Sequence, residues 1–280
     1  MSDLIKQIGE SAEIQKPANS LRILSYNLQV GIKTSRPSQY FTGSWKHLIP
    51  HSQRLSNLDA AVSILEPYDI VGLQETDAGS LRSNYINLTE YLADRARFPY
   101  WYHQVNRNLG HFAQHSNGLL SRIRPNAIEN LRLPGLIPGR QAMVAKYGTE
   151  KESLGVFILH LALSKRARLR QLAAISDQVN EFDHAIVMGD LNCKVNSNEM
   201  RLLFSRTRLH EPLEELRTFP SWRPLHHIDH ILVTSELKVI QAKALKHVCS
   251  DHLPIMMEVS IPGSVLLANE SLIDRSSIVA

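Results

Sequence analysis

The sequence predicts an α/β protein of the α+β kind, in which helices cover sheets. Strand-like segments alternate with helices in the first half of the chain, whereas strands follow one another near its end. A purely doubly wound fold would keep the alternation throughout, so this order favours sheets covered by helices.

The chain shows no internal repeat and no linker long enough to separate two domains. We therefore expect one domain over residues 20–262. Polar tails precede it at 1–19 and follow it at 263–280.

Two strands and two helices are predicted in the first third of the chain. The segment LRILSYNLQVGI, at 21–32, is apolar enough for a strand in a covered sheet. Apolar residues three and four apart predict a helix from residue 51 that Pro67 ends. IVGLQE, at 70–75, is the next strand, and the amphipathic segment 83–98 predicts a second helix.

The remaining segments are mostly strands. One long helix is predicted over 164–182, with Ser164 as its N-cap. The apolar segments that predict strands are 98–106, 116–122, 140–147, 154–163, 184–193, 228–234, 237–245 and 253–261.

The overall charge allows an anionic substrate without identifying one. The 280 residues include 31 Lys and Arg against 27 Asp and Glu, which gives a net charge of +4. A clustered basic face matters more for nucleic-acid binding than this total. The N-terminus resembles no signal peptide, and no apolar run reaches the ~20 residues of a membrane-spanning helix. We expect a cytoplasmic monomer with no transmembrane segment.

The two cysteines provide no disulfide framework. Cys193 and Cys249 both adjoin polar clusters, and we interpret them as buried thiols at strand ends. A redox gate is the alternative.

Polar residues gather where the predicted strands end. Buried strands reject carboxylates unless these are paired or bind a cation. One such cluster would be explained by a turn or a cap, but six together are hard to explain as independent turns. The clusters are Asn27, Glu75, His160, Asp190 with Asn192, Asp229 with His230, and Ser250 with Asp251 and His252.

The residue types in these clusters fit one chemistry. Glu, Asp and Asn oxygens suit Mg²⁺ or Mn²⁺, which binds phosphate oxygens and stabilises charge on phosphorus. A histidine beside an aspartate suits a general base that a carboxylate orients. Zinc is disfavoured: His226 and His230 are four apart, but a strand rather than a helix is predicted here, so they need not share a face. We expect these two histidines to line a pocket or lie on the surface.

Seven motifs occur in the order found in the endonuclease/exonuclease/phosphatase (DNase I-like) superfamily: SYNLQ, LQE, SNGLLSR, LHLAL, MGDLNC, IDHIL and SDHLP. The chain resembles bacterial members of that group over residues 21–260. The superfamily includes pancreatic-type DNases, AP endonucleases, neutral sphingomyelinases, inositol-phosphate 5-phosphatases and deadenylases. The resemblance implies a four-layer α/β/β/α sandwich of two mixed sheets with outer helices. It also implies a Mg²⁺-dependent phosphoric ester hydrolase.

The resemblance assigns the metal ligands and the general base. Glu75 would be the principal metal ligand, with Asn27 beside it, and Asp251 would serve the metal or its hydration shell. His252 would activate the attacking water, and Asp229 would hold its imidazole in the required tautomer.

The resemblance also assigns contacts to the phosphate. Asp190 and Asn192 would position nucleophile and phosphate, while His160 and Arg140 would contact phosphate oxygens. The basic segment after His160 could add a phosphate-attracting rim, although a solvated helix face explains most of it. Arg170 is the best candidate there, one helical turn from Arg166.

Two departures narrow the choice within the superfamily. Gln29 stands where AP endonucleases carry an aspartate, so the number of metal ions stays open between one and two. LHLAL carries a histidine that AP endonucleases lack, which argues against AP repair. The substrate is then a phosphodiester or phosphomonoester, as in nucleic acids or lipid or inositol phosphates. The alternatives are a catalytically inactive module that binds a phosphate ligand, and an exported effector.

Overall fold

The computed structural model describes residues 19–29, 51–108, 114–135, 139–212, 216–247, 249–265 and 267. The end of the strand predicted over 21–32 and most of both predicted tails lie outside these residues.

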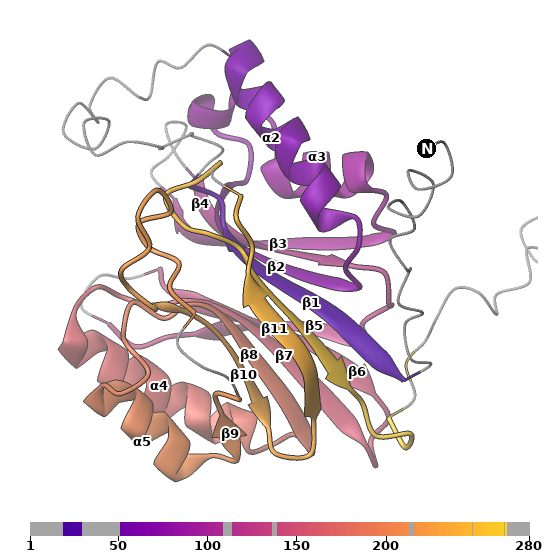
Figure 1. Cartoon of the computed structure of the whole chain (residues 1–280), viewed down its shortest axis with the longest axis vertical. Coiled ribbons are helices and arrows are strands. Elements are labelled where there is room, and N and C mark those ends of the chain that lie inside the picture. The colour runs from indigo at the N-terminus through magenta and orange to yellow at the C-terminus, as the bar shows by residue number, and fades with distance from the viewer. Residues whose placement is uncertain are drawn as a thin grey trace, which may run out of the picture.

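Two six-stranded sheets form the centre of the protein (Figure 1). The first sheet has the order β11-β12-β1-β2-β4-β3, and the second has the order β5-β6-β7-β8-β10-β9. Each sheet contains one parallel pair, β1 with β2 and β7 with β8, among antiparallel neighbours. Strands of the first sheet are β1 (Ser20–Asn27), β2 (Ile70–Asp77), β3 (Tyr100–Asn108), β4 (Gln114–Ser121), β11 (Lys238–Ala244) and β12 (Ile255–Ser260). Strands of the second are β5 (Ala127–Arg132), β6 (Gln141–Gly148), β7 (Ser153–His160), β8 (His184–Asp190), β9 (Leu209–His210) and β10 (Asp229–Thr234).

Helices cover the outer face of each sheet, which completes the four-layer sandwich that the resemblance implied (Figure 1). Helices α2 (His51–Leu65) and α3 (Leu88–Ala96) lie on the first sheet, near the short 3-10 turn η3 (Leu81–Ser83). Helices α4 (Lys165–Val179) and α5 (Asn198–Arg206) lie on the second sheet. In the described part of the chain, no helix combines the length and apolar character that crossing a membrane requires.

Alternating strand residues separate the buried apolar side chains into three layers. On β1, Leu21 and Ile23 join the core between the sheets, whereas Leu24 and Tyr26 pack under the helices of the first sheet. The same period of two divides the residues of β8 between the central core and the core under α4 and α5. Both faces of each sheet are therefore covered, which explains why these strands are apolar almost throughout.

This alternation also directs the polar strand ends. Asn27, His160 and Asp190 each have the same parity as the strand residues that face the central core. Asp229 shares its parity with Ile231 on β10, which faces the same core. Four strands that face the gap between the sheets with apolar groups therefore end there with polar groups. The fold predicts that these groups converge.

The second predicted helix begins later than the sequence suggested. It was expected over 83–98, but α3 starts at Leu88. Asn84 and Tyr85 have positive φ angles of 56° and 62°, which break a helix at that point. Asn87 then caps α3, because its Oδ1 accepts hydrogen bonds from the backbone N–H groups of the first turn.

Four elements were not predicted, namely η3, β5, α5 and the two-residue strand β9. Strand β5 is an edge strand without a buried residue, and α5 buries only two apolar side chains, Met200 and Leu203. Neither has the apolar period on which prediction depends. Ser164 does stand at the N-cap position of α4, but its side chain makes no capping hydrogen bond.

Gly189 allows the two strands that carry His160 and Asp190 to lie close together. Its φ of 138° is rarely adopted by other residues, and a Cβ here would lie 2.0 Å from the carbonyl oxygen of Leu159. Since Leu159 is paired with Gly189 in the β7–β8 ladder, a side chain would push these strands apart.

Gly189→Ala is therefore expected to lower the free energy of unfolding by at least about 2 kcal/mol, through backbone strain and overlap. Gly263→Ala is the matched control, because the nearest atom to its added Cβ is 3.6 Å away. Urea denaturation of both variants measures the difference. Equal stability losses would contradict this account of Gly189.

Candidate active site

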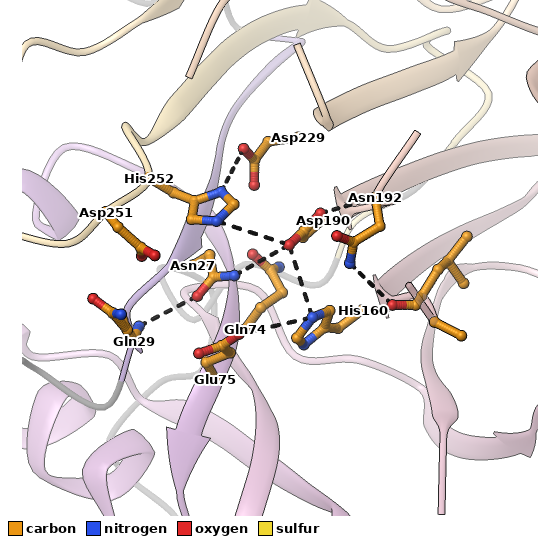
Figure 2. Close-up of polar contacts among 12 residues, drawn as sticks. Asn27, Gln29, Gln74, Glu75, His160, Asp190, Asn192, Asp229, Asp251 and His252 are labelled. Carbon is orange, nitrogen blue, oxygen red and sulfur yellow. Dashed lines mark hydrogen bonds and ion pairs between the residues drawn. The ribbon is translucent and has the colours of Figure 1, made fainter. Parts of the chain in front are cut away.

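The polar strand ends meet at one site between the two sheets (Figure 2). Within the second sheet, His160 is paired with Asp190, and Asp190 is paired with Asp229, so three neighbouring strands present these groups in register. Asn27 reaches the same place from the first sheet and donates from Nδ2 to Asp190 Oδ2 at 3.3 Å. His252 arrives from the loop before β12.

His252 and Asp229 form a buried hydrogen-bonded pair. The ring Nδ1 of His252 lies 2.8 Å from Asp229 Oδ2. That carboxylate oxygen also accepts a hydrogen bond from the hydroxyl of Thr218. An ionised carboxylate can only accept a hydrogen bond, so Nδ1 of His252 carries the proton. Nε2 is the second nitrogen of the ring. Nε2 lies 4.0 Å from Asp190 Oδ2 and faces the site.

Asp190 lies at the centre of the group (Figure 2). Its Oδ1 accepts from the backbone N–H of Asn192 at 2.9 Å, while Oδ2 accepts from Asn27. Asn192 has a positive φ of 52° and donates from its side chain to the carbonyl oxygen of Leu161 at 3.1 Å. These contacts fix the turn after β8, so the Asp190 carboxylate is held rather than free to rotate.

Glu75 enters the site because β2 is irregular. By simple alternation Glu75 would share the face of Val71 and Leu73, which pack under the helices. Its φ is 54°, and the register between β2 and β4 shifts between Leu73 and Thr76. Such a bulge re-aims a side chain. Glu75 Oε1 consequently lies 3.8 Å from His160 Nε2.

Burial and crowding of like charges perturb the carboxyl groups. Burial first, and then the neighbouring Asp229 carboxylate, raise the pKa of Asp190 to about 7. Burial and the charge of Asp251 likewise raise the pKa of Glu75 above its ordinary value. Several carboxylates are thus buried close to one another, and a bound cation would reduce their mutual repulsion.

The two histidines of the site are perturbed in opposite directions. Burial alone would lower the pKa of His252, but the carboxylates of Asp229, Asp190 and Asp251 outweigh it and raise that pKa to about 10. Burial and the Arg140 guanidinium hold the pKa of His160 well below its ordinary value. His160 is therefore neutral at pH 7.

The side-chain chemistry of the site fits the Mg²⁺ or Mn²⁺ that the sequence suggested. Glu75, Asp251 and Asn27 supply the oxygen atoms that such ions prefer, at the edge of a buried carboxylate cluster. Asn27 Oδ1 accepts from the backbone N–H of Gln29 at 3.2 Å, which fixes the orientation of its amide. Thiolate ligands are not part of this group, so the donors are hard oxygens.

A cavity of about 510 Å³ opens beside Glu75 and His160. Arg140 lines it next to these two residues, and its Nη1 donates to the carbonyl oxygen of His160 at 2.8 Å. Arg170 lines the same cavity from α4. The structure thus brings Arg140 and Arg170 to the edge of the site.

Sequence reasoning missed several residues around the site. Thr218 supports Asp229, and Asn106, His115 and Gln171 form cavity walls. These residues lie far apart in the sequence and outside any strand-end cluster of carboxylates. Of these, only His115 lies next to a predicted strand, that at 116–122, and a lone histidine is a weak sign of a site.

The basic segment after His160 does not act as one rim. Arg168 does not line the cavity, and its guanidinium instead binds Glu199 at 2.7 Å and the carbonyl oxygens of Ala162 and Leu163. Arg166 and Arg170 line the cavity, and Lys165 is an exposed residue outside its lining. The solvated-face interpretation therefore does not hold for Arg168, which is structural.

His230 was expected on the surface or in a pocket, and this was wrong. Its ring is fully buried, with Nδ1 3.1 Å from Glu211 Oε1 and Nε2 2.8 Å from the carbonyl oxygen of Cys193. His227 Nε2 lies 3.0 Å from the same Glu211 oxygen, whereas His226 is exposed and stacks on Phe219. The parity of β10 explains the outcome, because residue 230 faces away from Asp229.

Neither Cys193 nor Cys249 forms a disulfide, and Cys193 is buried as expected. Burial raises the pKa of Cys193 to about 11, so that its thiol is protonated at neutral pH. A protonated, buried thiol reacts slowly with oxidants, which argues against Cys193 as a redox gate. Cys249 is only partly buried.

A model of the Endonuclease/Exonuclease/phosphatase family matches residues 24–252. An endonuclease/exonuclease/phosphatase from Beutenbergia cavernae has a similar structure, with a TM-score of 0.67 and 18% identity, over 88% of this chain and 72% of that one. A mannosyl-6-phosphatase from Bacteroides thetaiotaomicron gives a TM-score of 0.67 and 16% identity, over 86% and 100% of the two chains. Beta toxin from Staphylococcus aureus gives a TM-score of 0.59 and 14% identity, over 85% of this chain and 99% of that one. A comparison with curated protein sequences found no match.

The Glu211 network is expected to stabilise the fold within a limited pH range. Burial opposes ionisation of Glu211, but the hydrogen bonds and charges of His227 and His230 outweigh it and lower its pKa to about 2. That stabilisation is present above pH 4.5 and is lost as the pH falls toward 2. The same contact raises the pKa of His230, and its contribution is complete below pH 6.5 and lost as the pH rises through the raised value.

Glu211→Gln should therefore lower the free energy of unfolding by up to about 3 kcal/mol between pH 4.5 and 6.5, and by less at pH 3. Denaturation at several pH values measures this. Glu236→Gln, which removes a surface pair with Arg208, is the control and should cost under ~1 kcal/mol. A loss for Glu211→Gln that is the same at pH 3 and pH 6 would refute the network's role.

Proposed function

This chain belongs to the endonuclease/exonuclease/phosphatase family, and we propose that it hydrolyses a phosphate ester with a water that His252 activates beside a bound Mg²⁺ or Mn²⁺. One observation carries the proposal. The His252 imidazole is locked by Asp229 at 2.8 Å, while its opposite nitrogen faces Asp190 across 4.0 Å. A base, an orienting carboxylate and a second carboxylate then surround one reacting position.

His252 and Asp190 would both act on the attacking water. Asp229 holds the proton of Nδ1, so Nε2 is the nitrogen that can accept a proton from a water in the site. Asp190, fixed by Asn27 and the backbone of Asn192, can hold the same water by a second hydrogen bond. The water oxygen then bonds to phosphorus, the ester P–O bond breaks, and the leaving oxygen takes up a proton.

Glu75, Asn27 and Asp251 would hold the metal ion. When bound, the ion would stabilise the negative charge that develops on the phosphate oxygens and offset the carboxylates that raise the pKa of His252. The offset matters because a general base must be unprotonated at the working pH. Gln29 supplies no carboxylate, so Glu75 and Asp251 would be the charged ligands of the ion.

His160, Asn192 and Arg140 would bind the phosphate. A neutral His160 keeps its Nε2 3.8 Å from both Glu75 and Asp190, too far for a hydrogen bond to either. That nitrogen can donate to a phosphate oxygen placed between them. Arg140 adds positive charge at the cavity edge, where the charge of a phosphate ester is stabilised.

The substrate is a phosphodiester or a phosphomonoester, in nucleic acid or in a lipid, inositol or sugar phosphate. The similarity to a mannosyl-6-phosphatase supports a small sugar-phosphate ester as one of these candidates. The alternative is an inactive module that binds a phosphate ligand. Intact Glu75, Asp190, Asp229 and His252 argue against it, since a binding module needs no oriented base.

His252→Ala and Glu75→Gln should each lower the turnover number by at least ~10²-fold, because they remove the general base and a metal ligand. The assay uses Mg²⁺ or Mn²⁺ with plasmid, single-stranded DNA, RNA, sphingomyelin, inositol phosphates and sugar phosphates. His103→Ala and Glu129→Gln change exposed residues of the same types and should keep full activity.

Equal turnover by the wild type and both site variants would refute the proposed mechanism. No turnover of any substrate by a protein that still binds the ion would favour the binding module.

A further inference from the structure

The cavity beside the proposed site extends beyond the space that one phosphate needs. Glu75, His160 and Arg140 form the end where the reacting phosphate would lie. Another part of the lining comes from residues 162–171, which lead into α4 and form its first two turns. A volume of about 510 Å³ suits a compact organic ligand.

Gln171 is a buried donor in that wall without a partner. Its side chain is 1% exposed, and its Oε1 accepts the backbone N–H of Ala162 at 3.0 Å. This contact fixes the amide orientation, because an N–H group needs an acceptor, and Nε2 is therefore the donor end. Among the described residues, Nε2 has no hydrogen-bond partner. A buried, unpaired donor is costly, so a ligand acceptor in the cavity explains its retention.

Asn106, on the strand wall of the same cavity, gives an independent sign. It is 6% exposed, and its Oδ1 has no partner in the described part of the chain. Two amide side chains from different elements thus border the cavity with unused hydrogen-bonding capacity. Such pairs are typical of a polar ligand site rather than of a packed core.

Two arginines add unneutralised positive charge. Arg166 and Arg170 lie one helical turn apart on α4, and both are exposed and line the cavity. Within the ranges that the structure describes, neither makes an ion pair or a side-chain hydrogen bond. Arg168, between them in sequence, is by contrast fully engaged by Glu199 and two carbonyl oxygens. Guanidinium groups placed in this way bind phosphate or carboxylate.

The wall beside these arginines is aliphatic. Ala162, Leu163 and Ala167 line the cavity together with the residues of the metal end. A carbon skeleton would lie against this wall while polar groups occupied the two ends.

We propose that Arg166, Arg170 and Gln171 form a second anion subsite, so that the substrate is a compact phosphate ester with a second phosphate or carboxylate on its skeleton. This proposal rests on the proposed function, because the reacting phosphate must occupy the His160 end. The subsite sets substrate choice through binding, and the chemistry at His252 is unchanged by it.

The test compares matched esters with the protein of residues 1–280 and Mg²⁺. One pair is fructose 6-phosphate and fructose 1,6-bisphosphate, and the other is adenosine 5′-monophosphate and adenosine 3′,5′-bisphosphate. The wild type should show at least about a tenfold lower KM for the bisphosphate in one pair, because two charge-assisted contacts are added. Arg166→Ala/Arg170→Ala should remove this difference with little change in kcat.

Lys165→Ala is the control for charge, since Lys165 lies on the same helix outside the cavity lining and should keep the preference. Arg170→Lys should keep part of the preference for the bisphosphate, because lysine retains the positive charge but not the forked donor of arginine. Equal KM values within both pairs, or equal effects of the double variant on mono- and bisphosphates, would overturn the subsite. Faster turnover of plasmid or single-stranded DNA than of any small ester would also overturn it.

Calorimetric titration with the two bisphosphates separates this proposal from the proposed function. If no ester is hydrolysed but a bisphosphate binds to the wild type and not to the double variant, the subsite stands and the hydrolase assignment fails. If no bisphosphate binds, the subsite is refuted whether or not a monoester is hydrolysed.

Discussion

The constraint that governs this protein is negative charge buried between two β-sheets. Asp190 and Asp229 occupy paired positions on neighbouring strands, and Glu75 and Asp251 approach the same place. Burial first, and then repulsion from the neighbouring Asp229 carboxylate, raise the pKa of Asp190 to about 7. A divalent cation would balance this charge and offset the carboxylates that raise the pKa of His252, so that its imidazole could act as an unprotonated base. The metal part of the proposal follows from that charge imbalance.

The fold holds the charges in place by backbone geometry. Strand parity turns Asn27, His160, Asp190 and Asp229 toward the gap between the sheets, because each strand already faces that gap with apolar side chains. Glu75 and Asn192 depart from regular geometry with φ angles of 54° and 52°. Such conformations are costly and cluster at functional sites. Dense packing on both sides of each sheet resists relaxation of these strained positions.

Much of this arrangement could be predicted from the sequence, for a specific reason. Apolar strands that end in carboxylates, amides or histidines are conspicuous, so Glu75, Asp190 and His252 were identified before their geometry was known. The burial of His230 against Glu211 was not predicted, because a shift of one residue along the strand decides whether a side chain faces the site or the other side of the sheet. Gln171 was missed because nothing in a helical sequence reveals an unpaired amide in a cavity wall. Strand β5 and helix α5 were not predicted because neither has a regular apolar period.

The claim that the buried carboxylates form a divalent-cation site can be measured without turnover. Titration of the protein with Mn²⁺, followed by the electron paramagnetic resonance signal of the free ion, counts bound ions directly. The account predicts saturable binding to the wild type that Mg²⁺ displaces and that Glu75→Gln weakens by at least ~10-fold. Retention of full Mn²⁺ affinity by Glu75→Gln, or no saturable binding to the wild type, would contradict it.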